Sequence, residues 1–151
     1  MLIVKASLFE GMSAQLMSKI EKASVEEVHN RGVFLFHHGE PADHLFILLE
    51  GRVRLSVGQH GHVALVVRNP GDCFGWSSLV DRETYTASAE CIAHTKLTKI
   101  RSDALAHIFE HDTASGMVFY KKLARMIGNR LANCYKLLPS AHGEKRSAPG
   151  G

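Results

Sequence analysis

The sequence predicts a mainly β protein with flanking helices, in which seven or eight short strands form an antiparallel sandwich or barrel. Between residues 25 and 100, apolar residues alternate with polar ones, which is the period of a strand with one buried face. Breaks rich in glycine, proline and asparagine recur there roughly every eight to twelve residues. On both sides of this region the apolar spacing changes to three and four, which is typical of amphipathic helices.

Length and composition indicate one soluble domain. The chain has 151 residues, of which 45% are apolar and 22% charged, as in ordinary globular proteins. It contains no apolar run long enough to span a bilayer and its N-terminus does not resemble a signal peptide, so we expect a cytoplasmic protein without a membrane partner. The three cysteines form no CxxC pair, so neither a disulfide framework nor a thiolate metal site is expected.

The N-terminal helix is expected over residues 8–20, with Ser13 available as an N-cap. The strands occupy residues 25–100. Within them Val53, Leu55 and Val57 alternate with polar residues, whereas residues 45–49 form a continuous apolar run between turns.

Two C-terminal helices are expected over residues 102–138, a short one capped by Ser102 or Asp103 and a long one that begins near residue 112. The long helix carries one apolar stripe with the spacing of a coiled-coil seam, made of Tyr120, Ala124, Ile127, Leu131, Cys134 and Leu138. A second ridge beside it consists of Phe119, Leu123 and Met126. Two stripes indicate that one packs on the chain's own sheet while the other meets a second copy, which predicts a homodimer. The alternative is one wide stripe buried within a monomer.

The tail, residues 139–151, has nothing apolar to bury and is expected to be disordered.

The stretch from residue 71 to residue 91 predicts a binding site. A turn leads through Gly75 into one helical turn that contains Ser77 and Ser78, and an alternating strand follows over residues 85–89. A glycine before a short helix leaves several backbone N–H groups pointing the same way, which suits a phosphate or a carboxylate. No catalytic group accompanies this receptor, so we expect a binding protein and not an enzyme.

The order of these elements resembles the cyclic nucleotide-binding domain family, found in catabolite-activator-type regulators and in certain kinases and channels. The resemblance is carried by residues 8–13, 38–53, 70–75 and 86–88. It implies an eight-stranded antiparallel β-roll, a jelly roll related to the cupins, with an N-terminal helix and a long C-terminal dimerisation helix. This domain would span residues 1–138.

The resemblance also implies that the family's ligand site is altered here. In the family, a glutamate after the Phe-Gly pair holds the ribose 2′-hydroxyl, and an arginine before the Thr/Ser-Ala-Thr/Ser strand pairs with the cyclic phosphate. These positions match Trp76 and Tyr85. Gly75, the backbone at Ser77 and Ser78, and the hydroxyl of Thr86 carry over from the family's contacts. Loss of the arginine alone weakens a cyclic phosphate on the order of ten- to a hundredfold.

Two side chains could restore binding. Arg82 could swing over the N-terminus of the short helix, and Trp76 could stack on a base or another flat ligand. The opposing interpretations are that Arg82 pairs with Asp81 or Glu83, and that Trp76 and Tyr85 fill the vacated pocket. No cofactor is expected, and a cyclic nucleotide or another small anionic effector stays open. The candidate ligand residues are Gly75, Trp76, Ser77, Ser78, Arg82, Tyr85 and Thr86.

Three functions follow. The first is a stand-alone dimeric sensor or regulatory module with a degenerate phosphate-binding cassette and an unknown effector, which would signal through its dimer helix to a partner protein in trans. The second is a transcription regulator of the catabolite-activator type that lacks its DNA-binding domain or is truncated before it, so nucleic acid is not an expected partner of this chain alone. The third is a cupin-like metal-binding protein, suggested by His60 and His62, although no carboxylate follows this pair and no metal is expected.

Overall fold

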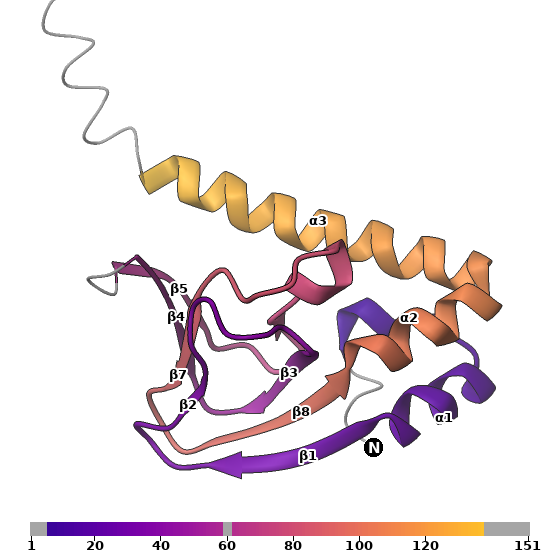
Figure 1. Ribbon diagram of the computed structural model, residues 1–151, viewed down its shortest axis with the longest axis horizontal. Helices are drawn as coiled ribbons and strands as arrows, with labels where there is room; N and C mark the ends of the chain where they lie inside the picture. Colours follow the sequence, from indigo (N-terminus) through magenta and orange to yellow (C-terminus); the bar gives the residue numbers. More distant parts are fainter. Residues whose placement is uncertain (1–5, 59–61, 138–151) are drawn as a thin grey trace, which may run out of the picture.

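The computed structural model describes residues 6–58 and 62–137. Two four-stranded antiparallel sheets form a roll, with α1 and α2 at one end and α3 running along its length (Figure 1). In chain order the elements are η2 (Ser7–Phe9), α1 (Ala14–Lys22), β1 (Ser24–His29), β2 (Phe34–Phe36), β3 (His44–Glu50), β4 (Val53–Val57), β5 (His62–Val67), β6 (Cys73–Phe74), η3 (Ser77–Val80), β7 (Ser88–Cys91), β8 (Thr95–Arg101), α2 (Ser102–His111) and α3 (Thr113–Leu137).

The strand order confirms the fold class. One sheet runs β1-β8-β3-β6 and the other β2-β7-β4-β5, and all paired strands within the described residues are antiparallel. Neighbours in each sheet are mostly distant in sequence, as in a jelly roll, where the chain crosses repeatedly from one sheet to the other.

The continuous apolar run of β3 is explained by two cores, one on each face of its sheet. Leu45 and Ile47 belong to a helix-side core beneath α1, α2 and α3. Phe46 and Leu48 point the opposite way into a roll core between the two sheets. Because successive strand residues face opposite sides, a strand that lies between two cores must be apolar at every position.

The expected helix over residues 8–20 is divided into η2 and α1. Gly11 separates them with a positive φ of 84°, a backbone conformation that glycine adopts without strain. Ser13 then begins α1, where its hydroxyl accepts a hydrogen bond from the backbone N–H of Leu16 at 3.2 Å.

The strand expected over residues 85–89 begins only at Ser88. Before it, Tyr85 pairs through its backbone with the loop that precedes β3: its N–H donates to the carbonyl of Glu40 and its carbonyl accepts from the N–H of Gly39, both at 2.9 Å. This pairing holds residue 85 on the loop and turns its ring into the roll core.

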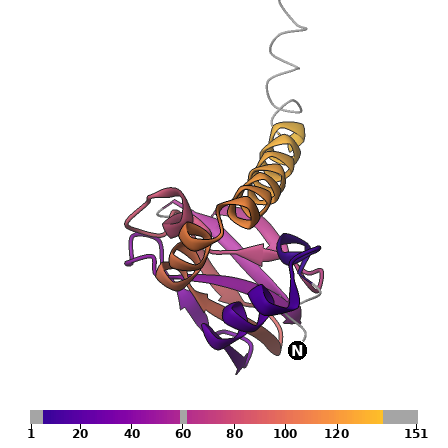
Figure 2. The same cartoon turned by 90° about the vertical axis from the view of Figure 1, so that its right-hand side faces the viewer.

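The ridge of α3 that faces the protein consists of Phe119 and Leu123, which are buried in the helix-side core. Phe119 stacks on Phe109 of α2, with ring centroids 4.7 Å apart. Gly116 permits this contact, because a Cβ at its position would lie 2.9 Å from the Cβ of Phe109. The C-terminal part of α3 projects away from the roll (Figure 2), and residues 131–136 are all exposed.

Candidate functional site

The expected one-turn helix forms at η3, directly after Gly75. Gly75 has a φ of 73°, and a Cβ there would lie 2.9 Å from the ring of Phe46, so both the conformation and the space favour glycine. Trp76 caps η3 through its backbone carbonyl, which accepts from the N–H of Leu79 at 2.9 Å. The expected glycine turn and one-turn helix are therefore both present.

Five of the seven predicted ligand residues surround one cavity. Phe36, Leu55 and Ala87 complete the wall of this cassette cavity, and the predicted residues in it are Gly75, Trp76, Ser77, Tyr85 and Thr86. The cavity has a volume of about 80 Å³, whereas small-molecule sites are generally on the order of 300 to 1,000 Å³. With its side chains in these positions, it does not accommodate a nucleotide.

Tyr85 is a bulky, fixed part of the wall of this cavity. Its side chain is only 4% exposed, and its ring stacks on Phe36 with centroids 3.8 Å apart. Its hydroxyl donates to the carbonyl oxygen of His44 at 2.9 Å and accepts from the N–H of the same residue at 3.1 Å. Burial raises the pKa of Tyr85, so the phenol stays protonated as a donor. An aromatic side chain thus fills this part of the roll and is hydrogen-bonded to its backbone.

Trp76 lies between the cassette cavity and the helices. It lines the cavity and also packs against the helix-side core, where Tyr120 and Ile127 of α3 are packed as well. Its indole is only partly buried. Trp76 therefore joins the wall of the site to the layer that contains α3.

Arg82 and Ser78 lie in a different cavity from Tyr85 and Thr86. This neighbouring cavity, of about 600 Å³, also contains Arg101 and four acidic side chains, those of Asp43, Asp81, Glu83 and Asp103. Arg82 forms no ion pair with any residue that the structure describes. Its side chain is exposed there and does not cap the N-terminus of η3.

Ser78 connects the short helix to α2. Its hydroxyl donates to the hydroxyl of Ser102, the first residue of α2, at 2.5 Å. Ser102 is buried and Ser78 is half-buried, so the contact lies partly within the protein at the wall of the neighbouring cavity. Sequence reasoning treated Ser78 only as a backbone donor and missed the contact, which joins residues 24 positions apart.

The predicted dimer stripe of α3 is partly covered. Tyr120 and Ile127 pack against the helix-side core, whereas Ala124, Leu131 and Cys134 are exposed; Leu138 lies outside the described residues. Two further exposed residues, Met117 at 77% and Tyr135 at 57%, were not included in the prediction. Met117 stands seven residues before Ala124, and this heptad spacing could have identified it.

The described residues contain no group of three or more His, Cys, Asp or Glu side chains that could hold a metal ion. Of the pair that suggested a cupin site, His60 lies outside the described residues and His62 begins β5. Within the described part of the chain, no helix has both the length and the apolar character needed to cross a bilayer.

The sequence of this chain matches those of known proteins over most of the region that contains the roll. Residues 26–112 match the family model of the cyclic nucleotide-binding domain. A CRP-like cAMP-activated global transcriptional regulator from Mycobacterium tuberculosis is 27% identical over 106 residues, which cover 69% of this chain and 47% of the regulator. The chain thus spans about half the length of that curated relative.

Solved structures show the same fold. A cyclic nucleotide-binding domain from Methylobacillus flagellatus KT superposes with a TM-score of 0.75 at 21% identity, covering 91% of this chain and 78% of that one. The sensor domain of the transcriptional regulator DNR from Pseudomonas aeruginosa superposes with a TM-score of 0.72 at 22% identity, covering 82% of this chain and 89% of that one.

Proposed function

This chain belongs to the cyclic nucleotide-binding domain family, and from that premise we propose that it is a dimeric regulatory module whose cassette does not bind a cyclic nucleotide in the family's usual mode. Its role is regulatory, and its output passes through α3 to a partner protein. The observation that carries the proposal is the ring of Tyr85, which is buried beside the small cassette cavity and is held by the backbone of His44.

The altered cassette is supported by charge as well as by volume. None of the side chains that line the cassette cavity is cationic, so a cyclic phosphate placed there would lose its hydration without gaining a charged partner. Arg82, the cation proposed to restore binding, lines the neighbouring cavity together with four carboxylates. These acids compete with any phosphate for its guanidinium.

The dimer is supported by the exposed part of α3. Leu131 is 49% exposed and Met117 and Tyr135 are more so, and all three stand on the side of α3 that turns away from Phe119 and Leu123. A second copy of the helix would cover them. Gly128 lies among them, and a Cβ at its position would have no neighbouring atom within 4 Å, so its small size leaves room for the close approach of another helix.

A contact path joins the cassette to α3. Ser78 of η3 is hydrogen-bonded to Ser102 of α2, and Phe109 at the other end of α2 stacks on Phe119 of α3. A ligand that moved η3 would displace α2 and thereby tilt α3. Energetic coupling along this path is part of the proposal.

Intrinsic fluorescence tests the cassette. Trp76 is the single tryptophan of the chain and lines the cavity, so its emission reports ligand entry. We expect cAMP and cGMP at millimolar concentrations to leave the emission unchanged. A saturable change in emission, confirmed by calorimetry, would show that the cassette opens to a cyclic nucleotide and would refute this part of the proposal.

Two matched substitutions test the dimer. Ala124→Glu places a charge within the predicted interface, whereas Asn129→Glu places the same charge about 140° further around the helix. Both residues are exposed, so neither change disturbs the core. In sedimentation velocity, we expect the parent and Asn129→Glu to sediment as dimers and Ala124→Glu as a monomer. A monomeric parent protein at micromolar concentration would contradict the proposed dimer.

A transcriptional output is the second candidate function, favoured by the similarity to the mycobacterial regulator. The cations of α3 supply the electrostatic requirement for contact with DNA, in particular Lys121, Arg125 and Lys136. Retardation of a random duplex at low salt, lost on addition of salt, would support it. No retardation under these conditions would eliminate DNA binding by this chain.

A further inference from the structure

A further cavity, the α3-flank cavity, lies on the other flank of α3 from the cassette. It has a volume of about 320 Å³ and opens between α3, the turn before β6 and the N-terminal segment that contains η2. It shares no lining residue with the cassette cavity. Met126, Asn129, Arg130 and Asn133 recur along this flank at spacings of three and four, so successive turns of α3 form one wall.

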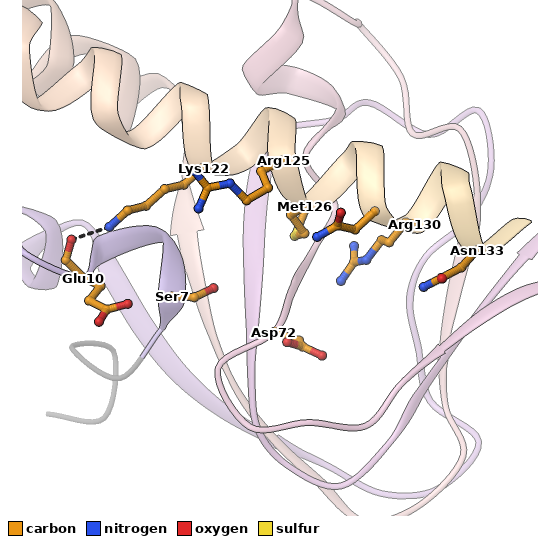
Figure 3. A pocket seen from close by; sticks show the side chains of 9 residues that line it. Ser7, Glu10, Asp72, Lys122, Arg125, Met126, Arg130 and Asn133 are labelled. Atoms are coloured by element: carbon orange, nitrogen blue, oxygen red, sulfur yellow. Dashed lines mark hydrogen bonds between the residues drawn. The ribbon is translucent and has the colours of Figure 1, made fainter.

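The cavity is rich in cations that lack acidic partners. Lys122, Arg125 and Arg130 extend from α3 toward it, and Glu10 and Asp72 lie on the opposite side (Figure 3). None of the three cations forms an ion pair with a residue that the structure describes. The three positive charges exceed the two negative ones, which leaves the wall of α3 able to attract an anion.

The hydrogen bonds of these cations are made to backbone carbonyls. Lys122 Nζ donates to the carbonyl oxygen of Glu10 and Arg130 Nη2 to that of Cys73, each at 2.5 Å. Arg130 Nη1 is buried and has no acceptor among the described residues. No carboxylate therefore neutralises the charge of this guanidinium, and an anion in the adjoining cavity would be stabilised by it.

From this arrangement we propose that the α3-flank cavity binds a small phosphate ester that carries hydroxyl groups. Arg125 and Arg130 offer planar donors that suit phosphate oxygens. The carboxylates of Glu10 and Asp72 accept hydrogen bonds from hydroxyls on the opposite side of the ligand. These same acids repel an extended polyanion, so the ligand is a small molecule and not a nucleic acid.

The position of this cavity gives such a ligand a regulatory effect. Arg130 already joins α3 to the carbonyl of Cys73, and Cys73 leads through Phe74 to Gly75 of the cassette. A phosphate held between Arg130 and the turn at Asp72 would strengthen the attachment of α3 to the roll. The proposed regulatory module would thus have an effector site outside its closed cassette; the binding itself does not depend on that proposal.

Thermal shift and calorimetry test the site with ribose 5-phosphate as the probe, ribose as the neutral control and inorganic phosphate as the bare anion. We expect ribose 5-phosphate to stabilise the protein, ribose to have no effect and phosphate to bind more weakly. Arg125→Gln and Arg130→Gln should each weaken ribose 5-phosphate roughly tenfold or more. Arg31→Gln removes an exposed arginine in the turn between β1 and β2 and should leave the affinity unchanged.

Three results would overturn the assignment. The first is that ribose 5-phosphate does not bind. The second is that Arg31→Gln weakens binding as much as Arg125→Gln and Arg130→Gln do, which would indicate a general effect of net charge. The third is that Thr86→Val in the cassette abolishes binding while Arg125→Gln does not, which would place the ligand in the cassette. Arg125 is exposed and forms no hydrogen bond with the described residues, so Arg125→Gln decides the matter even if Arg130→Gln does not fold. The proposed regulatory module is tested separately, by sedimentation of the parent protein and by the titration with cAMP, so its failure can be distinguished from failure of this site.

Discussion

The substitution Tyr85→Phe tests whether the hydroxyl of Tyr85 holds its ring in the roll core. Tyr85→Phe keeps the ring stacked on Phe36 and deletes both hydrogen bonds between the hydroxyl and the backbone of His44. At about 0.5 to 1.5 kcal/mol for each bond, the free energy of unfolding should fall by about 1 to 3 kcal/mol. For a domain of this size, that corresponds to a decrease in Tm of roughly 3 to 10 °C.

The assay is urea denaturation followed by far-UV circular dichroism at one fixed protein concentration, because the stability of a dimer depends on concentration. Tyr120→Phe is the matched control, since the ring of Tyr120 packs against the helix-side core while its hydroxyl forms no hydrogen bond with the described residues. This control should unfold like the parent. If Tyr85→Phe also unfolds like the parent, the hydroxyl does not hold the ring in the roll, and the inference that Tyr85 closes the cassette is wrong.

Two further predictions concern α3. Gly116→Ala should lower the free energy of unfolding by about 1 to 3 kcal/mol in thermal or urea unfolding, because the new methyl group would lie 2.9 Å from Phe109. This overpacking outweighs the gain in helix propensity, which is about 1 kcal/mol. Gly128→Ala, where nothing lies within 4 Å, should not be destabilising in the monomer; equal losses in the two variants would contradict the packing argument. Asp112→Ala should lower the Tm above pH 5, because hydrogen bonds from the backbone and side chain of Ser115 hold the pKa of Asp112 below its usual 3.8. A carboxyl group whose pKa is lower in the folded than in the unfolded protein stabilises the fold at pH values above its unfolded pKa. This contribution is lost as the pH falls through the folded pKa. The difference in Tm between the parent and Asp112→Ala should therefore shrink below about pH 4. A difference that does not change with pH would show that the carboxylate charge plays no part.

Local patterns in the sequence determined the fold class and the backbone of the cassette. Alternation identified the strands, because side chains in a strand face opposite sides in turn. The spacing of Phe119 and Leu123 correctly identified the ridge of α3 that enters the core, since a helix buries residues three and four apart. The position of Gly75 before a short helix likewise predicted η3, because a turn with a positive φ needs glycine.

The state of the candidate site was decided by contacts between distant parts of the chain. Sequence analysis left open whether Tyr85 fills the pocket; the structure places its hydroxyl on the backbone of His44, 41 residues away, and places Arg82 in a different cavity. The α3-flank cavity was not predicted at all, because Arg130 and Cys73 are 57 residues apart and meet only when α3 lies across the roll. Periodicity reports which face of an element is buried, but it carries no information about which other element covers that face. The sequence by itself therefore determined the elements and their buried faces, and only the tertiary packing decided which side chains share a cavity.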